Sequence, residues 1–192
     1  MKKIFTLFVV LFIALNSYAQ SDTIVYRYSQ TKAIKDKLTI KRLSLSDVVT
    51  KDKTIPKKIR NFKNLEVLSL RPIPTRFARP RGGGPCIIGY AKTKTTSLPS
   101  WMNELKNLET LDLIGINNID YFIEMKKFIG LSNLKELSID PEEFNNKLIE
   151  VLIKFSELKS LKIRALVTDE QLANLKTGLP NCEFVTGLYA DY

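Results

Sequence analysis

The chain contains no histidine, which limits the reaction chemistry that it can perform. Ser-His and Cys-His nucleophile pairs, the commonest general base and most catalytic zinc sites all need an imidazole. A pair of carboxylates, Asp112 and Glu136, remains as a candidate for glycoside hydrolysis. We expect these two to project from an open, shallow face without an enclosing pocket or aromatic sugar platform. The sequence therefore predicts a non-catalytic protein that carries no cofactor and no metal ion.

Three consecutive glycines, Gly82 to Gly84, resemble a loop that cradles a phosphate. A phosphate loop continues into Gly-Lys-Ser/Thr and lies between a strand and a helix, and neither feature is expected here. The glycines therefore indicate a turn or loop.

The segment 71–97 is strongly basic, with four arginines, two lysines and no carboxylate. Its density of Pro and Gly excludes a regular helix or a central strand. Long loops in compact domains are usually functional or disordered, and the apolar side chains in this one argue against complete disorder. We interpret it as a basic arm that engages an anionic glycan or lipid headgroups through Arg76, Arg79, Arg81 and Tyr90. In the alternative interpretation it is only a solvated loop, or it folds over the sheet and pairs with Asp112, Glu136 and Asp140.

The rest of the chain carries a repeated pattern of the form L-x-x-L-x-L. Strong copies span 65–70, 108–113, 134–139 and 158–163, and weaker ones span 40–45 and 179–184. The fourth positions are Leu43, Leu68, Leu111, Leu137, Leu161 and Cys182, separated by 25, 43, 26, 24 and 21 residues. All spacings but one lie within about 20–29 residues, and the exception indicates an insertion.

A second apolar pattern precedes several copies at spacings of three and four, as in Ile59, Phe62 and Leu65. Met102, Leu105 and Leu108 repeat it, and so do Leu148, Leu152 and Phe155. Such spacing indicates an amphipathic helical turn. Each unit is thus expected to be a short strand, a turn and a helical segment that returns beside the previous strand.

Residues 38–185 resemble the leucine-rich-repeat family on these copies and on phrases such as Leu105-Lys106-Asn107-Leu108. The resemblance implies an α/β solenoid of five to six repeats, with parallel strands on a concave face and short helices on a convex face. It also implies a protein partner. The asparagine that the family usually places three residues after the sixth position is replaced by Ile73, Ile116 and Glu142.

Side chains alternate across a strand, so positions three, five and seven are expected on the concave face. The charged residues at these positions are the candidate binding residues: Arg42, Arg71, Asp112, Glu136, Asp140, Lys162 and Arg164. The face is therefore mixed in charge, with an acidic centre and basic ends, and few aromatic side chains anchor it.

The first nineteen residues are typical of a signal peptide. Lys2 and Lys3 precede an apolar run from Ile4 to Leu15, and small residues precede the expected cleavage after Ala19. A buried N-terminal helix is the alternative. The run is too short to span a membrane, so we expect an exported protein that is periplasmic, on the cell surface or secreted. Residues 20–37 are expected to form an N-terminal cap and 38–192 the repeat domain with its insertion.

Export and basicity also bear on the partners. Without residues 1–19 the charge is 28 basic minus 20 acidic residues, or +8. The absence of any recognised binding module excludes nucleic acid as the preferred partner. Cys182 is expected to be buried in the core, which disfavours a disulfide with Cys86.

Three functions remain open: a protein-binding module that uses the concave face, a binder of anionic surfaces through 71–97, and a structural subunit of an envelope assembly. Substitutions on the concave face, added salt and the oligomeric state distinguish them.

Overall fold

A computed structural model of the chain describes residues 23–25, 27–52, 54–78 and 86–187, and the side chains of 23–25 and 76–88 are not described. The predicted signal peptide lies outside these residues. The main feature is a seven-stranded sheet of order β1-β2-β3-β6-β7-β8-β9 in which all neighbours are parallel. Its strands are β1 (Thr23–Val25), β2 (Ile40–Ser44), β3 (Val67–Ser69), β6 (Thr110–Asp112), β7 (Glu136–Ile139), β8 (Ser160–Ile163) and β9 (Glu183–Thr186).

The register of the sheet aligns the fourth positions of the L-x-x-L-x-L pattern across five neighbouring strands. Leu43 pairs with Leu68, and the row continues through Leu111, Leu137 and Leu161. All five side chains are buried. The predicted pattern of a parallel strand in each unit is therefore confirmed for these five copies.

The prediction that Cys182 occupies the fourth position of the sixth copy is wrong. Leu161 pairs with Phe184, and Cys182 lies two residues before it, half-buried against the edge of the core. The reason is the length of the preceding helix α5 (Asp169–Gly178), which is ten residues long and delays the start of β9. Leu179, read from the sequence as the first position of that copy, instead packs in the core behind the helix.

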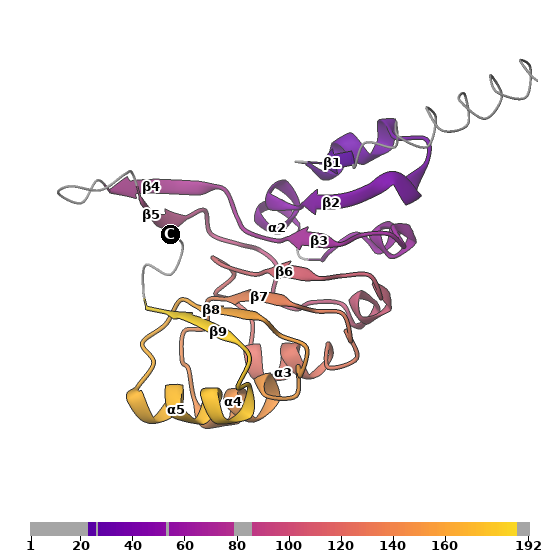
Figure 1. Cartoon of the computed structure of the whole chain (residues 1–192). Helices are drawn as coiled ribbons and strands as arrows, with labels where there is room; N and C mark the ends of the chain where they lie inside the picture. Colours follow the sequence, from indigo (N-terminus) through magenta and orange to yellow (C-terminus); the bar gives the residue numbers. More distant parts are fainter. Residues whose placement is uncertain (1–22, 26, 53, 79–85, 188–192) are drawn as a thin grey trace, which may run out of the picture.

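The helical segments are short. They are the 3-10 helices η1 (Tyr28–Ala33), η2 (Lys37–Thr39), η3 (Lys57–Asn61) and η4 (Ser100–Glu104), and the α-helices α2 (Ser46–Lys51), α3 (Tyr121–Lys126), α4 (Asn146–Leu152) and α5. Side chains of Asp120, Asn145 and Thr168 cap α3, α4 and α5 by accepting a backbone N–H of the first turn. Figure 1 shows α3, α4 and α5 together on one side of the sheet. The architecture is mixed α/β with short helices on one face of a parallel sheet.

One apolar cluster fills the space between sheet and helices, from Ile40 to Leu179. The buried carboxylate of Glu124 belongs to this framework. It accepts the N–H of Leu98 at 2.8 Å and pairs with Lys127 at 2.7 Å, and Lys127 also donates to the carbonyl of Leu98. These bonds tie α3 to the end of the insertion, and they compensate the cost of burying the charge.

The insertion forms an antiparallel hairpin of β4 (Pro74–Ala78) and β5 (Cys86–Tyr90). The sequence predicted that this segment forms neither a regular helix nor a central strand, and the hairpin agrees with this because it is a separate two-stranded sheet. The prediction of a loop is, however, wrong for the ten residues of β4 and β5. Prolines are tolerated here because β4 is an edge strand with shifted register. The hairpin projects from the edge at which the sheet strands end (Figure 1).

A row of asparagines connects neighbouring units of the sheet, and it lies before the strands instead of three residues after the sixth position of the pattern. Asn64, Asn107 and Asn133 each directly precede the first position of the pattern, and each donates its side-chain N–H to a backbone carbonyl of the preceding unit. The accepting carbonyls are those of Leu38, Lys63 and Lys106, at 3.0, 2.9 and 2.7 Å.

Candidate interaction surface

One face of the parallel sheet lies open. Parallel sheets are usually covered on both faces, but here the side chains that point away from the helices are all half-buried or exposed from β2 to β9. Many are small and hydroxylated, namely Ser44, Ser69, Thr110, Ser138 and Ser160. We call this face the concave face. It is formed by positions three and five of each L-x-x-L-x-L copy from β2 to β8, and by Glu183 and Val185 of β9.

Four of the predicted binding residues lie on the concave face itself. Arg42 and Glu136 are exposed, and Asp112 and Lys162 are half-buried. Glu136 accepts a hydrogen bond from the hydroxyl of Thr110 at 3.4 Å. Neither Arg42 nor Lys162 has a hydrogen bond or ion pair within the described part of the chain. These two cations are therefore available to a partner.

Asp112 and the three remaining predicted residues form two ion pairs at the ends of the strands. Arg71 donates from Nε to Oδ2 of Asp112 at 2.9 Å, and Arg164 donates from NH1 to Oδ2 of Asp140 at 3.0 Å. All four side chains are less than 30% exposed. The expected acidic centre with basic ends is thus largely compensated by short-range pairing, because β3 is adjacent to β6 and β7 to β8.

Tyr90, at the end of β5, lies between the two pairs. Its hydroxyl accepts a hydrogen bond from NH1 of Arg71 at 3.3 Å, and its ring centroid is 5.2 Å from Cζ of Arg164. The geometry with Arg164 is that of a cation–π contact. Tyr90 therefore connects the base of the hairpin to both ends of this charged row.

Gly115 makes the close approach of Tyr90 possible. Its φ of 85° lies in the left-handed region, and a Cβ there would be 2.8 Å from Cδ of Pro72 and 2.8 Å from Cγ of Tyr90. Its N–H donates to Asp140 at 2.9 Å. Gly115 is a site residue that was not predicted from the sequence. A lone glycine directly after the apolar pair Leu113-Ile114 was the available signal.

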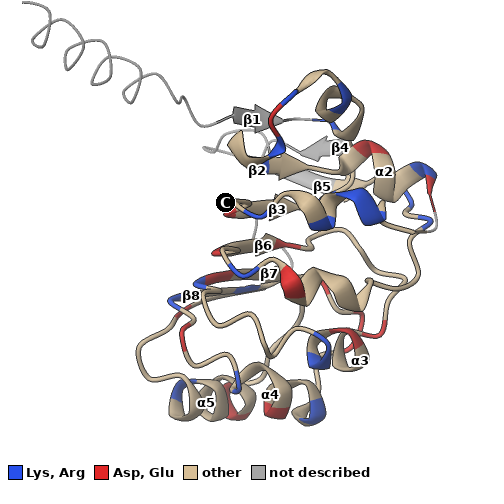
Figure 2. Cartoon of the chain, turned by 90° about the vertical axis from the view of Figure 1, so that its right-hand side faces the viewer, with Lys and Arg blue, Asp and Glu red and all other residues tan. Residues whose placement is uncertain are grey.

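The remaining predicted residues of the basic arm cannot be placed in the same way. Arg79 and Arg81 lie outside the described residues, and the side chain of Arg76 is not described. Lys92 and Lys94, on the segment that returns from the hairpin, are exposed. Basic residues dominate the N-terminal end of the sheet, where the described residues of 27–63 include eleven Lys and Arg but three Asp. Basic and acidic residues are interspersed over the remaining units (Figure 2).

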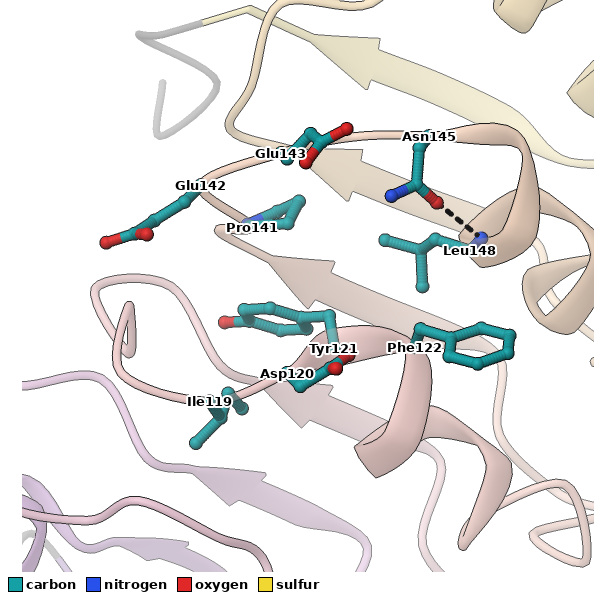
Figure 3. Close-up of a pocket in the computed structure, with 9 residues that line it drawn as sticks. All are labelled: Ile119, Asp120, Tyr121, Phe122, Pro141, Glu142, Glu143, Asn145 and Leu148. Atoms are coloured by element: carbon teal, nitrogen blue, oxygen red, sulfur yellow. Dashed lines mark hydrogen bonds between the residues drawn. The ribbon is translucent and has the colours of Figure 1, made fainter.

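Two hollows open beside the concave face. The first, of about 440 Å³, lies between the hairpin base and the loops after β6, β7 and β8. The second, of about 210 Å³, lies between the start of α3 and the loop after β7 (Figure 3). Glu142 lines both hollows.

Several polar groups that line the second hollow also stabilise the fold. Asp120 and Asn145 are the caps of α3 and α4. The hydroxyl of Tyr121 lies 3.0 Å from the carbonyl oxygen of Leu113 and 2.8 Å from that of Ile116, and can donate to either. Burial is the main cause that raises the pKa of Tyr121 well above 10. This phenol is therefore a neutral donor that holds the loop after β6.

Comparisons with known proteins do not show a family for this chain. No family model matches the chain, and no curated protein matches it. Among solved structures, the chain is similar to an LRR protein from Leptospira interrogans, with 16% sequence identity and a TM-score of 0.29. That match covers 86% of this chain and 55% of the other, so the chain spans about half the length of that protein.

Within the described residues, no helix has the length and apolar character needed to cross a membrane. The structure defines a mixed α/β protein with a parallel sheet, short helices on one face of it and an open face on the other.

Proposed function

We propose that this chain is an exported, non-catalytic binding module of the leucine-rich-repeat type, and that its concave face binds another protein. The open face of the parallel sheet is the observation that carries the proposal. Small hydroxylated side chains let a partner approach the sheet closely, while Arg42, Glu136 and Lys162 offer charges of both signs. Mixed polar surfaces of this kind suit a protein partner.

The repeat assignment is supported by two independent features. The spacing of the L-x-x-L-x-L copies lies within the leucine-rich-repeat range apart from the insertion. The row of paired leucines from Leu43 to Leu161 places these copies side by side. A stack of five to six units that share one core follows from this reading. Export is supported by the order of basic, apolar and small residues in 1–19.

A second candidate function is the binding of an anionic glycan or lipid headgroups through the basic segment 71–97. The observation in its favour is the projecting hairpin (Figure 1), which lies in a segment with four arginines, two lysines and no carboxylate. A partner bound in this way would be lost with added salt, because exposed charges are screened beyond about 10 Å at 0.1 M ionic strength.

A pulldown from the native envelope and medium separates these functions. Three forms of the mature protein are compared at low and high salt: the unaltered chain, a chain without 74–90, and the concave-face variant S69R/S138R. The matched control is E150R/K176E, which changes exposed residues of α4 and α5. Concave-face binding predicts one protein that survives high salt and hairpin deletion and is lost only with S69R/S138R. Loss with salt and with hairpin deletion would favour the second candidate instead.

A further inference from the structure

The larger hollow occupies a position where parallel sheets commonly bind ligands. Gly115, Asp140 and Arg164 line it, and each follows the carboxyl end of a strand of the main sheet. In open α/β sheets, ligands bind in the crevice outside these ends. Its volume of about 440 Å³ lies within the usual range of small-molecule sites, about 300–1,000 Å³.

The charged groups at the back of this hollow are already bound to one another. Asp140 accepts from Arg164 and from the N–H of Gly115, and Arg164 also lies over the ring of Tyr90. These groups form a fixed polar wall. They neutralise each other, so the wall offers a ligand no uncompensated charge.

The front of the hollow is different. Lys92, Asn117 and Glu142 are exposed there, and none has a hydrogen bond or ion pair within the described part of the chain. Together they supply an ammonium donor, a carboxamide that both donates and accepts, and a carboxylate acceptor. Carboxamide and carboxylate groups are planar, and each can bond two neighbouring hydroxyls of one ligand.

The second hollow adds acceptors without adding cations. It shares Glu142 and contributes Asp120 and Glu143, which Figure 3 shows on opposite sides of the opening. Over both hollows, four carboxylates face two cations, Lys92 and Arg164, which gives a net charge of −2 in a chain of formal charge +10. An anion is disfavoured here, whereas an uncharged ligand with many hydroxyl donors is well matched.

We propose that the two hollows form one site for an uncharged saccharide, with a sugar unit in the larger hollow and Glu142 at the junction. Asn117 and Glu142 are the recognising residues, and the Tyr90 and Arg164 wall shapes the site. This proposal does not rest on protein binding by the concave face, and it concerns a different ligand from the anionic partner of the basic hairpin.

The test is a titration of the ¹⁵N-labelled mature chain with millimolar glucose, N-acetylglucosamine, cellobiose and chitobiose, followed by amide chemical shifts. At least one neutral sugar is expected to shift the amides of Gly89, Ala91, Gly115 and Asn117. N117A/E142A should weaken that binding by more than about tenfold, as expected for the loss of one neutral and one charge-assisted hydrogen bond. The control N181A/E150A, on exposed positions outside both hollows, should leave it unchanged.

The absence of shifts at these amides with every neutral sugar would overturn the proposal. It would also be overturned if glucuronate or a lysine-like amine bound better than the neutral sugars, or if N117A/E142A left the affinity unaltered. S69R/S138R serves to separate the two proposals. It blocks the concave face and should leave the sugar-induced shifts intact, so that failure of protein binding and failure of saccharide binding are read independently.

Discussion

The ring of Tyr90 covers Gly115, so closely that a Cβ on Gly115 would lie 2.8 Å from Cγ of Tyr90. This contact joins an inserted hairpin to the loop that follows β6. Because Tyr90 also contacts Arg71 and Arg164, the same residue connects the hairpin to the charged row at the ends of the strands. The concave face and the hairpin base are therefore neighbouring parts of one surface.

Gly115→Ala tests whether this contact is as tight as the geometry indicates. The substitution adds left-handed backbone strain of about 1–3 kcal/mol and an overlap with Pro72 and Tyr90. Gly187→Ala is the matched control, since Gly187 also has a positive φ, of 123°, but no neighbouring atom within 4 Å. Urea denaturation should show a clearly larger loss of unfolding free energy for G115A. Equal losses would mean that Tyr90 does not press on Gly115.

Tyr90→Ala is expected to release the hairpin from the sheet. The loss of the ring contacts should raise the rate of tryptic cleavage within 71–97 about tenfold, which corresponds to about 1.4 kcal/mol of docking free energy. Tyr90→Phe keeps the ring and removes the hydroxyl that accepts from Arg71, so it should remain close to the unaltered chain. Docking through the hydroxyl alone would be indicated if Y90F were cleaved as fast as Y90A.

The row of asparagines predicts a loss and a gain of stability. Asn107→Ala removes the bond to the carbonyl of Lys63 and should lower the unfolding free energy by about 1 kcal/mol. Glu157 precedes Leu158 at the corresponding place, so Glu157→Asn should extend the row and raise stability by about 0.5–1 kcal/mol. Thermal or urea unfolding measures both, with N181A as the neutral control. A destabilised E157N would contradict the row of asparagines as a stabilising element.

The buried phenol of Tyr121 predicts a dependence of stability on alkaline pH. Its pKa in the folded chain is raised well above 10 by burial, whereas in the unfolded chain it titrates near 10. The contribution of the neutral phenol is therefore complete below pH 10 and is lost as the pH rises above 10, because only the unfolded chain releases the proton. Tyr121→Phe should flatten this loss between pH 10 and 11. An unchanged slope would assign the alkaline loss to other groups.

Much of the sheet was predictable because each strand depends on its neighbour in the same way. Leu43, Leu68, Leu111, Leu137 and Leu161 each need an apolar partner on both sides, so their spacing alone determines the register. The prediction of the last copy was wrong because Cys182 and Phe184 can both occupy an apolar position. Only the length of α5 decides between them.

The candidate site was less predictable, because it depends on contacts between segments distant in sequence. Arg71 and Asp112 were identified as surface charges, yet their pairing requires that the 43-residue interval fold outward as a hairpin. The position of Tyr90 over Gly115 follows from the same event. No local pattern encodes where the hairpin base comes to rest.

The most direct test of the central proposal is photo-crosslinking in the native envelope, with benzoylphenylalanine placed at Ser69 or Ser138 on the concave face. Glu150 and Lys176 on the helical face serve as controls. The account predicts that both concave positions give the same protein adduct, identified by mass spectrometry, and that the controls do not. Adducts from the helical face alone, or none from Ser69 and Ser138, would contradict binding through the open face of the sheet.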